Sequence, residues 1–367
     1  MSDNLTRNCA IRNALKRLRP TRPTGNLARH LLTTAHLVGG IVGSKHCRLP
    51  AIASKTPDGR KLQSRIMRFR RWLKNEQIDA ATYYRPYIEM LLANLPEGPL
   101  VLVMDASLVG RGCIALLVSV LYQKRALPLC WSVVKGKKGH LPEQAHIALL
   151  EEAAKVVGQD RTVIFLGDGE FDGVDLLGSL AKLGWSFVCR TSKNTVFFEG
   201  GERFCLSDFP LQTGDRYELE DVFFTERGFG PVLLVAVWRE GEKEPLCLVS
   251  NLEFFDEVLV WYKRRFQIET FFSDQKSRGF HLAHSHLSDP LRLERLMIAT
   301  CLAYLWVVCL GALVVARGWL PQIHRTDRCD LSLFQIGLLW IEHCLNEGLP
   351  LLVPFKVPRG PDRKSVR

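Results

Sequence analysis

Residues 100–105 have the sequence LVLVMD, and residues 162–168 have the sequence TVIFLGD. Each stretch is a continuous apolar run that ends in an aspartate, Asp105 in the first and Asp168 in the second. Short apolar runs of this kind are typical of strands that are buried on both faces of a sheet. Because ligands of open α/β sheets gather where such strands end, we expect the two carboxylates to lie close together.

The segments around these two runs complete an α/β pattern. Further strands are predicted at 113–121, 127–134 and 185–189, and helices at 142–157 and 174–183. Residues 192–251 alternate short β-rich runs with glycine turns, which indicates a β-rich insertion. Three more helices are predicted at 256–278, 289–317 and 331–346. This order predicts an α/β fold with a mixed sheet of ribonuclease-H-like topology.

The N-terminal fifth of the chain carries the excess positive charge. Residues 1–80 hold 17 Lys and Arg against 4 Asp and Glu, while the rest of the chain holds 32 against 34. Helices are predicted at 26–43 (ended by Gly39, Gly40 and Gly43), 48–55, 60–76 and 79–95. Three short helices with one strongly basic member, 60–76, suit a helix-turn-helix-like DNA-binding module. A plain helical bundle with a solvated charged face is the alternative.

These features divide the chain into four predicted regions. They are an α-helical, basic DNA-binding region (1–95), a catalytic core (96–191 and 252–350), a β-rich insertion subdomain (192–251) and a basic tail (351–367).

Composition limits the compartment and the kind of metal site. The 11 cysteines form no CxxC pair, so neither a disulfide framework nor a zinc site is indicated, and we expect a cytoplasmic protein. Residues 296–316 contain no charged residue and are long enough to span a membrane. They continue an amphipathic segment, however, so we expect a helix buried in the protein core and no membrane partner.

The helix predicted at 256–278 carries Tyr262, Arg265, Glu269 and Lys276, with the spacing Y-x2-R-x3-E-x6-K. An α-helix advances about 100° per residue, so all four would project from one stripe roughly 60° wide. A carboxylate beside a guanidinium and an ammonium suits a surface that handles phosphates. A solvated helix face with intrahelical ion pairs is the alternative.

Three carboxylates in such an arrangement would suit magnesium. Asp105, Asp168 and Glu269 supply hard oxygen ligands of the kind that Mg²⁺ prefers. Two metal ions held by them would stabilise the attacking and leaving oxygens of an in-line phosphoryl displacement.

The stripe and the two aspartates resemble the DDE transposases of the IS-four insertion-sequence family. The Y-R-E-K signature matches in full, and the resemblance covers roughly residues 98–317, including the β-rich insertion. It implies that Asp105, Asp168 and Glu269 are the catalytic metal ligands for two Mg²⁺ ions, for which Mn²⁺ can substitute. It further implies that Tyr262, Arg265 and Lys276 contact the DNA backbone near the cleaved end.

The resemblance also implies an activity and its partners. Family members bind the terminal inverted repeats of their element, excise it and join its ends to target DNA. They act on double-stranded DNA as homodimers in the DNA complex, which places the protein at the bacterial nucleoid. In relatives an aromatic residue of the insertion stacks on a flipped base, a role for which Trp238 is the candidate. A place in the small core of the insertion is the alternative for this tryptophan.

The chain departs from the family pattern after the second aspartate. Gly169-Glu170-Phe171 stands where Arg-Gly-Phe is common, which removes a basic residue and adds Glu170 and then Asp172 as rival acids. Asp168, at the end of its strand, remains the preferred ligand.

Two basic stretches are candidates for the DNA channel. Lys137 belongs to the KGKK sequence at 135–138, and Lys193 follows the strand predicted at 185–189. Both are predicted to bind phosphates, and a solvated loop is the alternative for each. Besides an active transposase, two other functions fit the sequence: a DNA-binding protein derived from a transposase, and a metal-dependent nuclease of the same fold.

Overall fold

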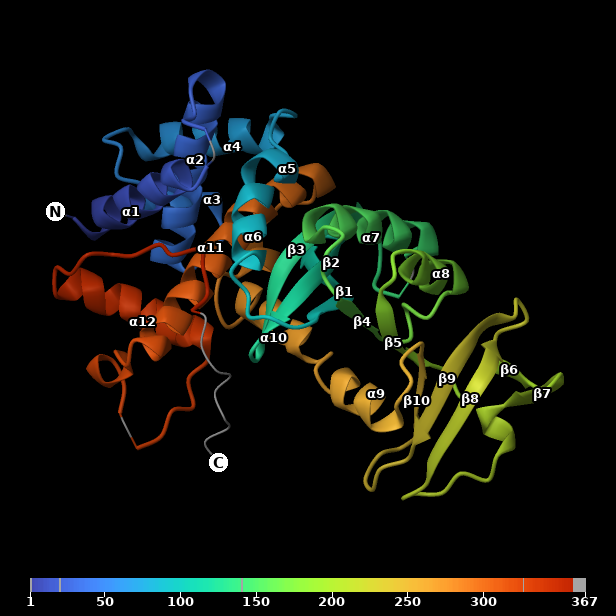
Figure 1. The fold of residues 1–367 in the computed structure, drawn as a ribbon. Coiled ribbons are helices and arrows are strands. Elements are labelled where there is room, and N and C mark those ends of the chain that lie inside the picture. The colour runs from blue at the N-terminus through green and yellow to red at the C-terminus, as the bar shows by residue number, and fades with distance from the viewer. Residues whose placement is uncertain (1, 20, 140, 326, 359–367) are drawn as a thin grey trace.

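A single mixed β-sheet runs through the molecule, which is described by a computed structural model covering all residues except 1, 20, 140, 326 and 359–367. The order of its ten strands is β3-β2-β1-β4-β5-β10-β9-β8-β6-β7 (Figure 1). Their bounds are β1 (Leu100–Gly110), β2 (Cys113–Tyr122), β3 (Arg125–Lys135), β4 (Val163–Gly167), β5 (Ser186–Thr191), β6 (Val196–Glu199), β7 (Glu202–Cys205), β8 (Arg216–Phe224), β9 (Phe229–Val237) and β10 (Leu246–Ser250). The predicted mixed α/β architecture is confirmed.

Helices precede, cover and follow the sheet (Figure 1). The α-helices are α1 (Asp3–Arg17), α2 (Gly25–Ser44), α3 (Leu49–Ser54), α4 (Leu62–Lys74), α5 (Ala80–Tyr83), α6 (Arg85–Leu92), α7 (Glu143–Val157), α8 (Val174–Lys182), α9 (Phe255–Tyr262), α10 (Gln267–Gln275), α11 (Pro290–Ala316) and α12 (Leu333–Asn346). Three short 3-10 helices are η1 (Leu206–Asp208), η2 (Leu282–Ser285) and η3 (Leu320–Gln322). Helix α1 and strand β7 have no counterpart among the predicted elements.

Strand β1 is longer than predicted, because it has two different neighbours. Residues 100–103 pair in parallel with residues 163–166 of β4. Beyond that point β1 continues to Gly110 by antiparallel pairing with β2, and Asp105 lies opposite Leu117. The prediction that this strand ends at Asp105 is therefore wrong. Asp105 instead marks where the parallel pairing with β4 has stopped.

The predicted insertion continues the central sheet. Strand β10 pairs with β5 on one side and β9 on the other, so strands β6 to β10 extend the same sheet outward. Strands β6 and β7 form a hairpin whose turn contains Gly200 and Gly201, both with positive φ. Two consecutive glycines favour such tight hairpin turns because they adopt positive φ without a steric penalty.

Helix α11 connects the helical part of the molecule to the sheet. It packs against α2, α4, α12 and β3, and so joins the N-terminal helices to the sheet. Its most apolar 18-residue window is 89% buried, which confirms the predicted core helix. Gly311 and Gly337 allow α11 and α12 to pack closely: a Cβ at Gly311 would lie 1.9 Å from the Leu333 carbonyl oxygen.

One predicted helix is divided in the structure for a local reason. The single helix expected at 79–95 is divided into α5 and α6, because Pro86 lies in the first turn of α6 and lacks the N–H that a continuous helix requires. Helix α2 (Gly25–Ser44) confirms the helix predicted at 26–43 to within one residue at each end, although Gly39 and Gly40 lie inside it and do not end it. A Cβ at Gly40 would lie 2.6 Å from Ile52 Cγ2, so this glycine permits close packing against α3.

Candidate active site

Asp105 is a buried carboxylate within β1. Its side chain is only 5% exposed. The Oδ1 atom accepts hydrogen bonds from the main-chain N–H of Ala106 (2.7 Å) and from Lys138 Nζ (2.9 Å). The sheet register fixes the backbone here, and the two donors compensate the charge that burial would otherwise penalise.

Asp168 follows β4 in a tight turn beside Asp105. Both aspartates lie two residues beyond the last parallel pair, Val103 with Leu166, so the register brings them to the same point of the sheet. The main-chain N–H of Glu170 donates to Asp168 Oδ1 at 3.0 Å. Asp168 Oδ2 lies 3.8 Å from Arg265 Nη1. The sequence therefore located both carboxylates at one edge, although it misjudged the length of β1.

The helix predicted at 256–278 is not continuous. It is divided into α9 and α10 by a tighter turn at residues 263–266. In this turn, Arg265 N–H donates to the Tyr262 carbonyl and Ile268 N–H to the Arg265 carbonyl, a three-residue spacing in place of the α-helical four. The angular positions calculated for one α-helix therefore do not apply across Tyr262 and Lys276. This stretch contains neither proline nor glycine, so it carries no local signal for the break.

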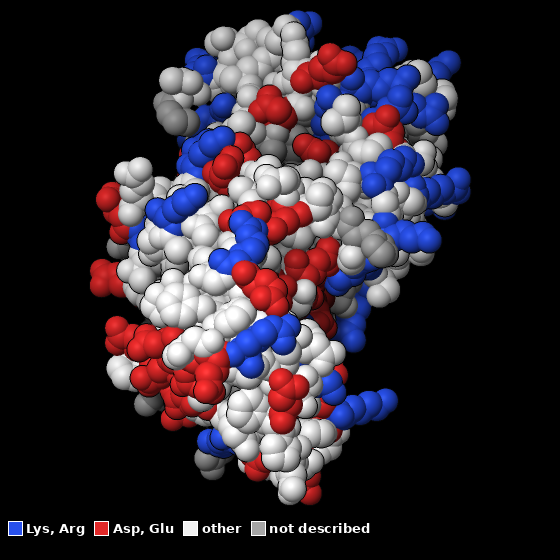
Figure 2. All heavy atoms as spheres, turned by 90° about the vertical axis from the view of Figure 1, so that its right-hand side faces the viewer, with Lys and Arg blue, Asp and Glu red and all other residues white. Residues whose placement is uncertain are grey.

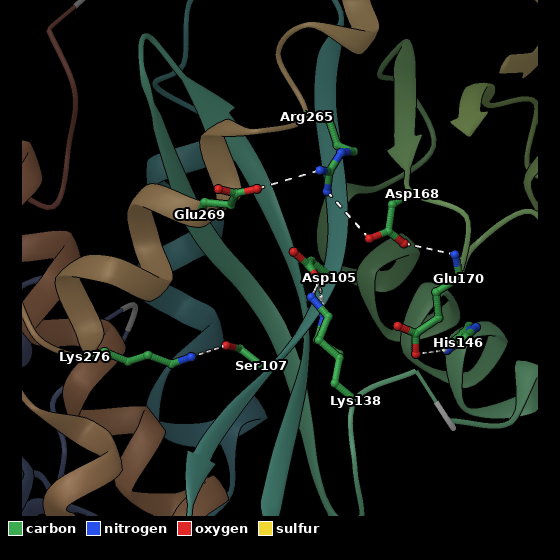
Figure 3. A network of polar contacts seen from close by, with 10 residues as sticks. Asp105, Ser107, Lys138, His146, Asp168, Glu170, Arg265, Glu269 and Lys276 are labelled. Atoms are coloured by element: carbon green, nitrogen blue, oxygen red, sulfur yellow. Dashed lines mark hydrogen bonds and ion pairs between the residues drawn. The ribbon is translucent and has the colours of Figure 1, made fainter. Parts of the chain in front are cut away.

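Arg265 nevertheless connects two of the predicted ligands (Figure 3). Its guanidinium is 9% exposed and lies 3.8 Å from Asp168 and 3.8 Å from Glu269. Glu269 is on the first turn of α10, and its side chain is 60% exposed. The structure thus brings Asp168, Arg265 and Glu269 together, with the arginine between the two carboxylates.

The other two residues of the stripe have different surroundings. Lys276 follows α10 and donates from Nζ to Ser107 Oγ of β1 at 2.5 Å. Burial and the nearby charge of Lys138 lower the pKa of Lys276, while Asp105 opposes the effect. Tyr262 is buried, and burial raises the pKa of its hydroxyl.

The remaining predicted DNA-binding residues have surroundings of their own. Lys137 and Lys193 are exposed, and the Lys193 carbonyl accepts a hydrogen bond from the Ser207 N–H. Trp238 is half-buried at the end of β9, where its indole Nε1 donates to the Glu242 carbonyl at 3.0 Å.

Three more residues lie at the site: Glu170, which the sequence offered as a rival acid, Lys138, which it offered only within the KGKK stretch, and His146, which it did not single out. Lys138 binds Asp105, and Glu170 turns toward the same region from the loop after β4 (Figure 3). His146 on α7 is buried, and its Nε2 lies 3.9 Å from Glu170 Oε1. Burial lowers the pKa of His146 and, together with the charge of Asp168, raises that of Glu170. The KGKK stretch was a signal for Lys138, but only the loop conformation distinguishes it from its neighbours.

The basic helix of the N-terminal region is partly neutralised. Arg65 and Arg68 of α4 pair with Asp58 at 2.6 and 2.8 Å. The cations that α4 leaves exposed are Arg70, Arg71 and Lys74. On the face shown in Figure 2, Lys and Arg gather along the upper right edge, and Asp and Glu through the middle and lower left.

The donor set at this edge of the sheet is compatible with a divalent cation. Asp105 and Asp168 present carboxylate oxygens, the ligand type that Mg²⁺ prefers. Cationic side chains already lie against both: Lys138 against Asp105, and Arg265 against Asp168. Within the described part of the chain, no three His, Cys, Asp or Glu side chains are arranged so that they could hold a metal ion. Glu269 is directed toward Arg265.

Comparison with known families identifies the protein family of this chain. The family model described as "Transposase DDE domain" matches residues 99–306, more than half of the chain. The chain belongs to this transposase family. The matched segment begins just before β1 and contains Asp105, Asp168 and Glu269. A search of curated proteins finds no match.

One solved structure similar to this family member is a piggyBac transposase synaptic complex with hairpin DNA, determined by cryo-electron microscopy. The sequence identity is 12% and the TM-score 0.49, and the alignment covers 99% of this chain and 85% of that one.

Proposed function

We propose that this protein is a cut-and-paste transposase that binds the terminal inverted repeats of an insertion sequence of the IS-four type, cleaves there and joins the ends to target DNA. The main support is the placement of Asp105 and Asp168 side by side by the parallel pairing of β1 with β4. The link from Asp168 through Arg265 to Glu269 adds the third acidic residue of a DDE set.

The order of the first five strands supports a ribonuclease-H-like core. In the order β3-β2-β1-β4-β5, the strands β1, β4 and β5 are parallel, and β2 is antiparallel to both of its neighbours. In this proposal residues 96–191 and 252–350 form the catalytic core, and 192–251 are its insertion. Residues 1–95 bind DNA, with the exposed cations of α4 as phosphate contacts. Residues 351–367 form the basic tail, of which 359–367 lie outside the described residues.

The residues that would hold metal are Asp105, Asp168 and Glu269, with two Mg²⁺ ions expected and Mn²⁺ as a substitute. When bound, such ions lower the pKa of an attacking water and stabilise the leaving oxygen of a phosphoryl displacement. The sheet register keeps the two aspartates in place before any ligand arrives. Arg265, buried between two acids, orients the carboxylate of Glu269 relative to Asp168.

The remaining residues would bind and orient DNA. Arg265 and Lys276 would contact phosphates near the cleaved end, and Tyr262 would line that contact from the buried side. Lys137 and Lys193, both exposed, would bind the backbone farther along the duplex. Trp238 is the candidate for stacking on an extruded base. We propose that the active form is a homodimer on DNA.

A cleavage assay tests this function. The protein is incubated with Mg²⁺ and with DNA duplexes that carry the inverted repeats flanking its gene, and wild type is compared with Glu269→Ala. Wild type should cleave at the repeat ends and transfer the strands, whereas the variant should bind the same DNA without cleaving it. Cleavage by the variant would refute the assignment of Glu269. Binding without cleavage by wild type would indicate a DNA-binding protein, and cleavage without joining a nuclease.

A further inference from the structure

The loop between β3 and α7 places an ammonium group on the carboxylates of the site. Lys138 Nζ donates to Asp105 Oδ1 at 2.9 Å (Figure 3). The main-chain N–H of the next residue, Gly139, lies close enough to the Glu170 carboxylate to lower its pKa. Gly139 has a φ of +83°, a conformation that side chains disfavour, so this docking depends on glycine.

Three acids act on this one cation. Burial tends to lower the pKa of Lys138, but the hydrogen bond to Asp105 and the charges of Asp105, Asp168 and Glu170 outweigh it, so the pKa is raised. The same charged groups also affect Glu170. Burial and the charge of Asp168 raise the pKa of Glu170, and the charge of Lys138 lowers it. Lys138 contacts Asp105 directly at 2.9 Å, and Asp168 and Glu170 lie beside this pair on the loop after β4 (Figure 3).

The two partners differ in how firmly they are held. Asp105 is 5% exposed and is fixed within β1, whereas the Lys138 side chain is 50% exposed on a loop. Removing the partner of a buried carboxylate is strongly destabilising, so a cation at this point stabilises the folded protein. A half-exposed lysine on a glycine-containing loop can leave without disturbing the core.

A divalent metal and the lysine would compete for the same carboxylate. Both would bind the Asp105 side chain, and two cations a few ångströms apart repel each other in a partly buried site. We propose that Lys138 is a tethered cation that occupies the carboxylate site of the metal-free protein, with Glu170 as a member of that site, and that a divalent metal must displace it. The displaced lysine, next to Lys137, is then available for a DNA phosphate. This inference rests on the proposed function.

Metal binding without DNA tests the competition directly. Titration calorimetry with Mn²⁺ is compared between wild type, Lys138→Met and Lys137→Met, the last of which removes the same charge from the same loop. Lys138→Met should bind Mn²⁺ about tenfold more tightly than wild type, because no ammonium has to leave. Lys137→Met should stay within about twofold of wild type. Lys138→Arg, which keeps a cation, should not show the increase, and Asp105→Asn should lose binding.

Thermal unfolding supplies a second measurement on the same variants. Without metal, Lys138→Met should melt at a lower temperature than wild type, because the acids have lost their counter-charge. Saturating Mn²⁺ should remove this difference in melting temperature, because the metal then supplies the positive charge in both proteins.

The outcomes separate this inference from the proposed function. If wild type binds Mn²⁺ and Lys138→Met binds it no more tightly than Lys137→Met, the tethered-cation role is refuted and the metal site stands. If neither wild type nor Lys138→Met binds Mn²⁺, the metal site itself is refuted and the inference falls with it. Binding by Lys138→Met alone would support both.

Discussion

The two aspartates and Glu269 are held in opposite ways. Asp105 is 5% exposed, lies within a strand and accepts hydrogen bonds from a main-chain N–H and a lysine. Glu269 is 60% exposed and lies in the first turn of α10, a helix of nine residues that follows a tight turn. Arg265, 3.8 Å from Glu269, links it to the site. The sheet therefore fixes one side of the site, and a short helix presents the other.

This difference indicates an order of assembly. The aspartates are in position in the DNA-free protein, where Lys138 and Arg265 neutralise them. Glu269 has an exposed side chain that can change partners at little cost. We expect the sheet side to bind cations by itself and the helix side to contribute when DNA is present.

The largest effect should come from removing each acid in turn. Asp105→Asn, Asp168→Asn and Glu269→Gln should each reduce cleavage by about 10³-fold, or about 4 kcal/mol, because each removes a metal ligand. Only the two aspartate variants should lose Mn²⁺ binding in the absence of DNA. Cleavage kinetics and calorimetry on the same preparations measure both quantities. Loss of DNA-free binding in Glu269→Gln would contradict the proposed order of assembly.

Arg265 connects the two sides, and its loss should have the next largest effect. Arg265→Gln should reduce cleavage by about 100-fold, because the two acids lose their common partner and move apart. Arg265→Lys should restore little, since one ammonium cannot reach two carboxylates as a planar guanidinium does. Single-turnover cleavage at saturating DNA isolates this step from binding. Full activity of the lysine variant would show that charge alone suffices.

Each side also contains a carboxyl whose ionisation opposes folding, the half-buried Asp172 and the buried Asp274. Burial raises the pKa of Asp172, near Asp168, and of Asp274, at the end of α10, to about 6 from 3.8. The folded state prefers the protonated form, so this stabilisation is complete below pH 4 and is lost as the pH rises through 6. Asp172→Asn and Asp274→Asn should each flatten the fall in unfolding free energy between pH 4 and 7 by up to about 3 kcal/mol.

Urea titrations across this pH range measure those slopes, and wild type at the same pH values is the reference. Only the slopes are compared, because Asp274→Asn also weakens the ion pair with Arg125 at 2.8 Å. A slope identical to that of wild type in either variant would show that folding does not raise the pKa of the corresponding carboxyl.

The smallest effect concerns the contact between Lys276 and β1. Ser107→Ala removes the oxygen that accepts from Lys276 Nζ. The unfolding free energy should fall by about 1 kcal/mol, the usual contribution of one hydrogen bond. Cleavage should change by less than about threefold, because Lys276 remains free to bind a phosphate. A larger loss of activity would mean that the serine positions the lysine for catalysis.

Much of the fold was predictable because the strands are strongly patterned. The apolar runs before Asp105 and Asp168 predicted neighbouring strands, and the paired register of β1 and β4 is why this worked. The break between α9 and α10 was not predictable, because no glycine or proline marks it. The missed hairpin strand β7 had a signal in Gly200 and Gly201, but its four residues, Glu202–Cys205, do not alternate between polar and apolar side chains.

The sequence by itself determined which chemical groups are present and which two apolar strands lead to Asp105 and Asp168. This was possible because apolar patterning depends only on the order of residues along the chain. It also determined that residues 296–316 lie in a buried helix. Only the tertiary structure decided the partners: Lys138 on Asp105, Arg265 between Asp168 and Glu269, and Glu170 beside His146. Apart from the i,i+4 pair of Arg265 with Glu269, these contacts join residues that are far apart in the chain, and such long-range pairing leaves no periodic trace in a sequence.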